Sequence, residues 1–477
     1  MQTRKDLYQA HKFMTQRLGM ALLQGEPDLP ESPMRRHNVA MFAGILIAIL
    51  IAAGFGIYGM LKPGGATKLT DPGQLLVEEE TGAAYVYSEQ EGRLLPVANY
   101  VSARLLLDSD QIKVRTVSSE SLAGFARGPQ VGIAGAPDSL PKPQRMVKTP
   151  WSVCVTEGQD VAGTRRSYVT LVGGTDVGGA SPGAADALLV NDGQNSWALW
   201  ANQRMLVHNV DRLTDQTPRR VPLSWINAIP EGSPFAAPVI SGRGKRIPGP
   251  SGMTLRVGQV FKVDAVAGAP ARWYVLLADG LAAITQTQAT LLTQDPASKA
   301  AYGGNRVREI LIDAANANAT KQSAQKIKGG GMPDTMPRFQ APAMSAPLCM
   351  VYADLLKGSV KGRLTVGSTV QIRAPKTSAS SERFDQVVLP PGGAAVAGQL
   401  PGEGQLSSVH QFYLITDQGR KFRLATPDVV TKLGYDASHV APLPPHLLRL
   451  IPDGPALDPA AARTPLSDTP SLRASGP

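Results

Sequence analysis

The sequence predicts an α+β protein in which one N-terminal transmembrane helix precedes an extramembrane domain of small strand–helix repeats around a central β domain. Two observations support this fold class. One stretch near the N-terminus is long and uncharged enough to cross a bilayer. Beyond it, one pattern of strand, turn, strand and helix recurs along the chain, as internal duplication produces.

The N-terminal arm, residues 1–38, contains an amphipathic helix over residues 3–23. Its apolar residues fall at i, i+3 and i+4 spacing, and its basic residues mostly lie elsewhere. The apolar positions are Leu7, Ala10, His11, Met14, Leu18, Ala21 and Leu22. The arm is too short to bury this stripe within itself. The stripe must therefore meet a partner protein or lie on the membrane face. We favour a partner, bound through Leu7, Met14, Leu18 and Leu22.

The transmembrane segment, residues 39–61, runs from Val39 to Leu61 and reads VAMFAGILIAILIAAGFGIYGML, without a charged residue. At about 1.5 Å per helical residue, this segment spans a hydrocarbon core of about 30 Å. A signal peptide is excluded, because the apolar run is longer than an h-region and the arm before it is too long.

Small residues recur at every fourth position of this segment, namely Ala40, Gly44, Ala48, Ala52 and Gly56. Small residues at this spacing let two helix backbones approach closely in a membrane. Ala and Gly are also common in membrane spans, so chance is the alternative. A genuine helix-packing face would mean that the protein works within an assembly.

Charge and cysteine usage indicate on which side of the membrane the large C-terminal part lies. The arm carries six Lys/Arg and four acidic residues, which favours a cytosolic arm, but Lys62 and Lys68 after the span weaken this signal. Cys154 and Cys349 both lie in strand-like apolar runs. They are either two unrelated buried thiols or a disulfide formed in an oxidising compartment, and we favour the disulfide. Loop entropy would then contribute roughly 5 kcal/mol of stability at most.

Net charge is +10 and spread thinly. No Lys/Arg run with interleaved aromatic residues is present in the sequence, so nucleic-acid binding is not indicated. Mild, unspecific attraction to an anionic lipid or cell-wall surface is compatible with this charge.

The repeated pattern appears at residues 84–106, 273–292 and 412–434. Each copy has an aromatic-rich strand, a turn with Gly92, Gly280 or Gly419, a second apolar stretch and a helical pattern. A degenerate copy begins at Trp197 and lacks the turn glycine. A second shared element follows two of the copies, IPEGSPFAAP at 229–238 and IPDGPALDP at 451–459. Each unit is too small for its own core, so the copies must pack on one another or on a central sheet.

Helix punctuation is clearest in the last copy, where Thr426 is the predicted N-cap, Pro427 the first helical residue and Gly434 the residue after the end. The central β domain is predicted from the cysteine segments, residues 151–156 with 167–172 and residues 348–352 with 363–372. The predicted disulfide would join two halves of the domain. The repeat domain with this core covers residues 62–452, and residues 453–477 form a Pro/Ala-rich extended tail.

No enzyme is visible in the sequence. The glycine-rich stretches 173–179 and 242–246 lack the full phosphate-loop pattern. The G-x-S-x-G match at 179–183 fails because Pro182 has no N–H for an oxyanion. The histidines beyond the span, His208, His410, His439 and His446, lack metal-ligand spacing. The sequence therefore predicts no catalytic, cofactor-binding or metal-binding residue.

Several segments together resemble EccB, the membrane component of mycobacterial and related actinobacterial type VII (ESX) secretion systems. They are the arm beginning TRKDLYQAHKFMTQRL, the MRRHN stretch before the span, GAPDSLP at 135–141, WSVC, VVLPPGG at 387–393 and IPDGPALDP. The resemblance covers essentially the whole chain, and the first 60 residues are its most specific part.

This resemblance implies a single-pass inner-membrane protein with a cytosolic N-terminus and an elongated periplasmic domain of repeats around a central β domain, stabilised by a disulfide. It also implies partners: the EccC motor ATPase, EccD, EccE, the mycosin protease and other EccB copies, in a hexameric complex. We expect a structural subunit that supports protein export across the inner membrane. The alternatives are a periplasmic ATPase subunit of the same system, with ATP as its cofactor, and a membrane-anchored cell-wall-binding protein.

Overall fold

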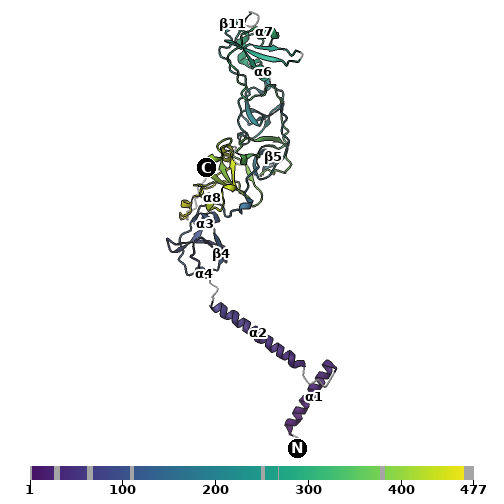
Figure 1. Ribbon diagram of the computed structural model, residues 1–477, viewed down its shortest axis with the longest axis vertical. Helices are drawn as coiled ribbons and strands as arrows, with labels where there is room; N and C mark the ends of the chain where they lie inside the picture. The colour runs from purple at the N-terminus through teal and green to yellow at the C-terminus, as the bar shows by residue number, and fades with distance from the viewer. Residues whose placement is uncertain are drawn as a thin grey trace. The chain divides into compact units, whose positions relative to one another are not determined.

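The computed structural model describes residues 3–25, 33–61, 68–107, 112–248, 253–266, 268–375 and 382–466. The chain forms two compact units. The first contains the helices α1 (Arg4–Gln24) and α2 (Pro33–Leu61), and the second contains nearly all of residues 70–477 (Figure 1).

Four sheets of the second unit share one strand order, in which the third, second, first and fourth strands of a repeat follow one another across the sheet. We call these units repeats 1 to 4. Repeat 1 has β1 (Gln74–Glu78), β2 (Ala84–Ser88), β3 (Arg93–Val97) and β4 (Lys113–Val117). Repeat 2 has β7 (Asp186–Asn191), β8 (Ser196–Trp200), β9 (Gln203–Val207) and β10 (Arg219–Arg220). Repeat 3 has β13 (Val260–Val263), β14 (Arg272–Leu277), β15 (Gly280–Ile284) and β16 (Ile310–Leu311). Repeat 4 has β21 (Ala394–Gln399), β22 (Phe412–Thr416), β23 (Lys421–Arg423) and β24 (Val440–Leu443).

Helices connect the third and fourth strands of three repeats: α3 (Tyr100–Leu106), α6 (Gln286–Gln294) and α8 (Val429–Lys432). In repeat 2 the 3₁₀ turn η2 (Val210–Arg212) takes this place. The fourth strand runs parallel to the first in repeats 2, 3 and 4. The shared order confirms the duplication that the sequence pattern predicts.

The segment after the fourth strand also recurs, because in every repeat it forms a parallel bridge to the third strand. The bridges are Leu94–Arg127, Arg204–Glu231, Leu281–Gln322 and Lys421–Asp453. IPEGSPFAAP and IPDGPALDP are therefore equivalent parts of repeats 2 and 4. Sequence comparison detects only these two copies because the other two segments have different residues.

The turn without glycine in repeat 2 is closed by Ala201 and Asn202, whose φ angles are 48° and 63°. Asn tolerates this left-handed backbone better than most residues. Its side-chain Oδ1 also accepts a hydrogen bond from Leu364 N at 2.8 Å. Repeat 2 thus tolerates the loss of the glycine and gains a contact to the central sheet.

The predicted start of the helix in repeat 4 is wrong. The helix α8 begins at Val429 rather than Pro427, since Val429 N and Val430 N donate to the carbonyls of Thr426 and Pro427 across tighter three-residue turns. Gly434 does lie just beyond the helix, with φ of +87°.

The central sheet has five strands in the order β19, β18, β5, β6 and β20. These strands are β19 (Arg363–Val366), β18 (Leu348–Tyr352), β5 (Trp151–Gln159), β6 (Arg165–Gly173) and β20 (Gln386–Val388). The chain leaves this sheet after β6 and returns at β18, and repeats 2 and 3 lie in the excursion. Repeat 3 is itself inserted into repeat 2, because β17 (Arg338–Gln340) pairs in parallel with β7. A small hairpin of β11 (Arg246–Pro248) and β12 (Thr254–Arg256) precedes repeat 3.

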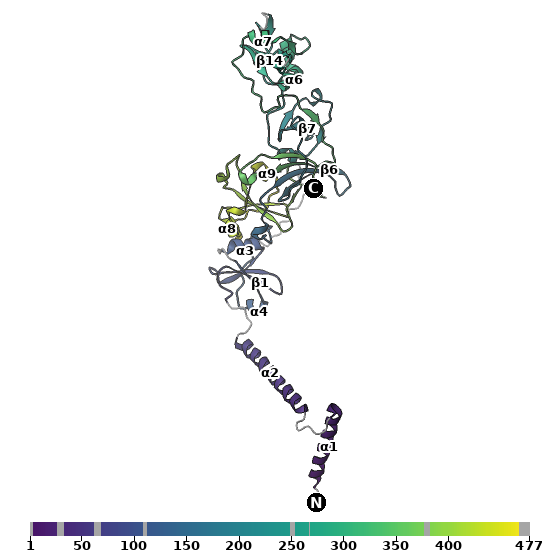
Figure 2. The same cartoon turned by 45° about the vertical axis from the view of Figure 1, so that its right-hand side comes forward.

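Hydrophobic cores extend across the repeats, as the small size of each unit predicts. One core joins the central sheet to repeats 2 and 4 through Trp151, Trp225 and Leu447, which are fully buried. A second joins repeat 1 to repeat 4, where α3 lies beside α8 in both views (Figures 1 and 2). There Arg104 Nε donates to Lys432 O at 3.0 Å. A third core joins repeats 2 and 3 around Phe235.

The predicted extended tail must be corrected for residues 453–466. The side chains of Leu457 and Ala462 are fully buried, and α10 (Pro459–Ala462) packs against α3 of repeat 1. Asp453 forms an ion pair with the buried Lys421. The proline and alanine content of residues 453–466 is typical of an extended tail, but this segment completes repeat 4 and packs against repeat 1. Residues 467–477, and residues 62–67 at the predicted start of the repeat domain, lie outside the described residues.

Candidate membrane anchor, helical arm and disulfide-bearing sheet

The helix α2 contains the predicted transmembrane segment and begins six residues before it, at Pro33. Within its stretch Arg35–Tyr58, an 18-residue window has a mean hydropathy of 2.5, and none of that window is buried by the rest of the chain. Length and composition thus allow this helix to cross a membrane, and its apolar side chains have no cover within the described residues.

The five small residues of α2, Ala40, Gly44, Ala48, Ala52 and Gly56, lie on this exposed surface. Positions four apart form a ridge inclined to the helix axis. No atom of the described residues beyond the helix itself lies within 4 Å of a Cβ built on Gly44 or Gly56. The ridge is open to a second helix, and its role in packing stays a prediction.

The helix α1 forms where the amphipathic pattern predicts it. Asp6 accepts hydrogen bonds from the backbone N–H of Thr3 at 3.0 Å and from its hydroxyl at 2.6 Å. These two bonds stabilise the charged carboxylate and hold the pKa of Asp6 below its usual range, and the bond from the Thr3 hydroxyl contributes more than the bond from its N–H. The helix ends at Gly25, which has a left-handed φ of 72°.

The predicted stripe of α1 is exposed along its length. The exposed fractions are 64% for Leu7, 67% for Met14, 61% for Leu18 and 84% for Leu22. Tyr8 and Phe13, which the stripe does not include, are exposed as well. The spacing of the apolar residues does not predict them, because Tyr8 and Phe13 lie beside the stripe on the helix surface and do not belong to its i, i+3, i+4 series. Partner binding by these residues stays a prediction.

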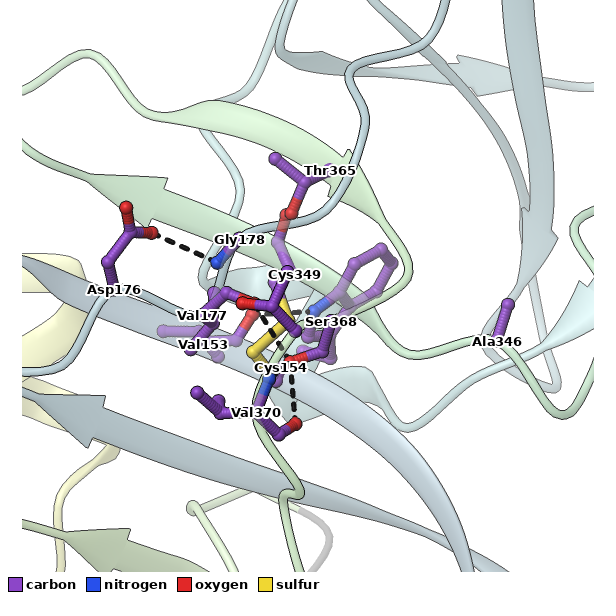
Figure 3. Close-up of a disulfide and its surroundings, with 12 residues drawn as sticks. Val153, Cys154, Asp176, Val177, Gly178, Ala346, Cys349, Thr365, Ser368 and Val370 are labelled. Atoms are coloured by element: carbon purple, nitrogen blue, oxygen red, sulfur yellow. Dashed lines mark hydrogen bonds between the residues drawn. A yellow bond between two sulfur atoms is a disulfide. The ribbon is translucent and has the colours of Figure 1, made fainter.

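The predicted disulfide is present. Cys154 on β5 and Cys349 on β18 face each other directly in the antiparallel register, with Cα atoms 4.1 Å apart (Figure 3). Both side chains are fully buried among Val172, Val177 and Val351. The bond joins β5 of one predicted strand pair to β18 of the other, so it ties the two halves of the central sheet together, as predicted. It also encloses the excursion that contains repeats 2 and 3.

The glycine-rich stretch 173–179 covers this disulfide. Ser368 Oγ lies within hydrogen-bonding distance of two carbonyl oxygens, that of Val177 at 2.9 Å and that of Val370 at 2.8 Å, which share its one proton (Figure 3). Gly178 N donates to Asp176 Oδ1 at 3.0 Å. A Cβ on Gly179 would lie 2.5 Å from Gly367 O, so glycine is required for this close approach. The glycines serve packing over the central sheet.

His446 lies at a junction that the sequence does not reveal. Its Nε2 is 3.0 Å from the hydroxyl oxygen of Tyr352, and that hydroxyl donates to Ala228 O at 2.6 Å. The three residues come from α9 (Pro445–Leu450) of repeat 4, from the central sheet and from the end of α5 (Leu223–Asn227) in repeat 2. Burial, and then the charge of Arg449, lowers the pKa of His446 to about 4. The imidazole is therefore neutral at pH 7.

Within the described residues, no group of three His, Cys, Asp or Glu side chains is placed to hold a metal ion. The sequence missed the Tyr352–His446 junction because its members are far apart in the chain and none belongs to a motif.

Comparison with known proteins places these features in a family. Residues 1–470 match the model of the family described as "Type VII secretion system ESX-1, transport TM domain B", EccB. The chain is 27% identical to the "ESX-1 secretion system ATPase EccB1" of Mycolicibacterium smegmatis (strain MKD8), over 94% of this chain and 92% of that protein. It is 26% identical to the "ESX-5 secretion system ATPase EccB5" of Mycobacterium tuberculosis (strain H37Rv), over 95% and 91% respectively.

Solved structures share the fold. A chain of an intact ESX-5 inner membrane complex matches with a TM-score of 0.63 and 22% identity, over 98% of this chain and 96% of that chain. A chain of the EccB3 dimer from the ESX-3 core complex matches with a TM-score of 0.61 and 23% identity, over 82% and 99%.

Proposed function

This chain belongs to the EccB family of type VII secretion proteins, and from that premise we propose that it is a structural subunit of an ESX membrane complex. The observation that supports this most is the family match over residues 1–470, which takes in the arm, the span and all four repeats. A protein whose first two helices expose apolar surface throughout needs other subunits or lipid to cover it.

In the proposed arrangement α2 is the single membrane span, α1 lies in the cytosol and the repeats lie in the periplasm. The buried disulfide supports a periplasmic location for the repeats, because such bonds persist in oxidising compartments. The six Lys/Arg of the arm support its cytosolic location.

The proposed partners are the EccC motor ATPase, EccD, EccE, the mycosin protease and further EccB copies. We infer that the stripe of α1 binds one of the cytosolic subunits and that the ridge of small residues on α2 packs against another span. The solved relatives support the association of EccB copies, since one of them is an EccB3 dimer and another is part of an ESX-5 inner membrane complex.

The test is native mass determination of the tagged protein after detergent extraction from its own cells, with the co-purified subunits identified. We expect a very large complex that contains a motor ATPase. Replacing Leu7, Met14 and Leu18 together with Ser should release these subunits, because it removes the apolar stripe. Replacing Gln9 and Gln16 on the opposite face with Ser is the matched control. A lone monomer from wild-type cells would contradict the proposal.

The names of the relatives give a second candidate function, nucleotide hydrolysis with ATP as the cofactor. This candidate predicts turnover of ATP by the purified full chain, free of other subunits, and its loss on substitution of one acid or base. Turnover that remains associated only with fractions containing EccC would count against it.

A further inference from the structure

Two segments that mark the family resemblance, GAPDSLP at 135–141 and VVLPPGG at 387–393, come together although some 250 residues separate them. Residues of both line one hollow of about 420 Å³ between the end of repeat 1 and the sheet of repeat 4. A hollow of this size is in the range of small-ligand sites. Both segments also contribute buried side chains to the packed cores, namely Ala136, Val387 and Leu389, and this packing brings the residues of the hollow together.

Two cations line this hollow. Lys142 and Arg145 have exposed side chains. In the described part of the chain, neither side chain has a hydrogen bond or ion pair; the only bond between the two residues is from Arg145 N to Lys142 O. The guanidinium of Arg145 rests on the backbone of Gly392, because a Cβ at Gly392 would lie only 2.8 Å from Arg145 Nη1. The glycine thus admits the guanidinium at the rim, where its planar set of donors matches a carboxylate or a phosphate.

A second hollow of about 520 Å³ shares Arg145 and Gly393 with the first, and Lys148 lines it. The charged residues of the two hollows are Lys142, Arg145 and Lys148 against the single carboxylate of Asp417. The combined positive charge attracts an anion, and Asp417 repels any negatively charged group of the ligand that lies close to it.

We propose that the first hollow is a binding site for an oxyanion, phosphate or carboxylate, carried by a small molecule or by the end of a polymer. Arg145 binds the oxyanion in a bidentate manner, and Lys142 supplies a second positive charge. This inference goes beyond the structural role and does not depend on it.

The experiment is isothermal titration calorimetry on the detergent-purified full chain. Inorganic pyrophosphate and ATP represent phosphate, and acetyl-D-alanyl-D-alanine represents a peptide carboxylate. We expect saturable binding of one class, which identifies the source of the oxyanion, with affinity that decreases as salt is raised. Arg145→Gln should weaken this binding at least about tenfold, because it removes a charge-assisted pair.

Arg165→Gln is the control, since Arg165 is an exposed cation that lines neither hollow. Equal thermal midpoints of the variants and the wild type exclude a folding defect. Absence of saturable binding by all three probes would overturn the proposal. Binding that Arg145→Gln leaves unchanged would overturn it equally, because the ligand would then occupy another place.

Discussion

The fold lowers the pKa of His446 to about 4, well below the usual range of a histidine. Its imidazole is packed beside Tyr352 at the junction of repeats 2 and 4 with the central sheet. Burial disfavours a charged ring there, so the neutral form is the one that the folded protein holds at pH 7. A single side chain thereby makes the contact between three parts of the fold dependent on pH.

We expect acid to destabilise the protein through this residue. The pKa of His446 is about 4 when folded and about 6.5 when unfolded, so between these values the unfolded chain binds a proton that the folded chain does not. Stability from this residue is fully present above pH 6.5 and is lost as pH falls towards 4, by roughly 3 kcal/mol at most. Thermal unfolding of the wild type and of His446→Gln, compared at pH 7.5 and 4.5, measures this loss as the difference between the two pH dependences.

The exposed His208 provides the control, because His208→Gln should keep the pH dependence of the wild type. If His446→Gln also keeps it, then protonation of other groups governs acid stability and the junction is insensitive to pH.

At the scale of elements, the sequence predicts local features well and connections poorly. The arm helix, the apolar span and the hairpins around Gly92, Gly280 and Gly419 follow from spacing that one window of sequence contains. The parallel fourth strands of repeats 2 and 3 do not, since β10 and β16 have only two residues each and are defined by the strands that they meet. The same reason explains why residues 453–466 resemble a free tail in sequence but pack in the structure.

The disulfide shows how such a local feature acts over a long range. Because it joins β5 to β18, it closes a loop with a sequence separation of 195 residues, which contains β6 and the excursion from the central sheet. Replacing both cysteines with Ala should lower the free energy of unfolding by up to about 5 kcal/mol. Denaturant unfolding followed by tryptophan fluorescence measures this change.

Reductant offers a check on the same element. Both cysteines are fully buried, so dithiothreitol should leave the folded wild type unchanged and reproduce the effect of the double substitution only in denaturant. Equal unfolding midpoints for the double Ala variant and the wild type would show that β18 is held by its strand partners alone.

The ridge of small residues on α2 gives a prediction about helix association. Replacing Gly44 and Ala48 with Leu should separate this span from its neighbour, because bulky side chains prevent close approach of the backbones. The amount of partner subunits that co-purifies after mild detergent extraction measures this effect. Leu46→Ile with Leu50→Ile is the matched control on the opposite face, where both side chains are exposed. Equal recovery of partners from both variants would mean that the ridge is a consequence of composition.

At the scale of the whole molecule, nested insertion orders the chain. Repeat 3 interrupts repeat 2, both lie within the excursion from the central sheet, and repeat 4 joins that sheet to repeat 1 through shared cores. Contacts between segments far apart in sequence therefore determine the packing. The four repeats share one strand order but pack against different parts of the molecule. Such contacts cannot be read from one repeat in isolation.

The same organisation permits a direct test of orientation in the membrane. Both native cysteines are buried in the disulfide, so the described chain offers no thiol to a labelling reagent. A cysteine introduced at the exposed Ser241 reports on the repeats, and one at the exposed Gln9 reports on the arm. In spheroplasts, a maleimide that cannot cross membranes should label Ser241→Cys at once and Gln9→Cys only after permeabilisation. The reason is that the proposed span places the two cysteines on opposite sides of a bilayer that the reagent does not cross. Labelling of Gln9→Cys in intact spheroplasts, with Ser241→Cys protected, would reverse the orientation and place the disulfide in the cytosol, where it would not persist.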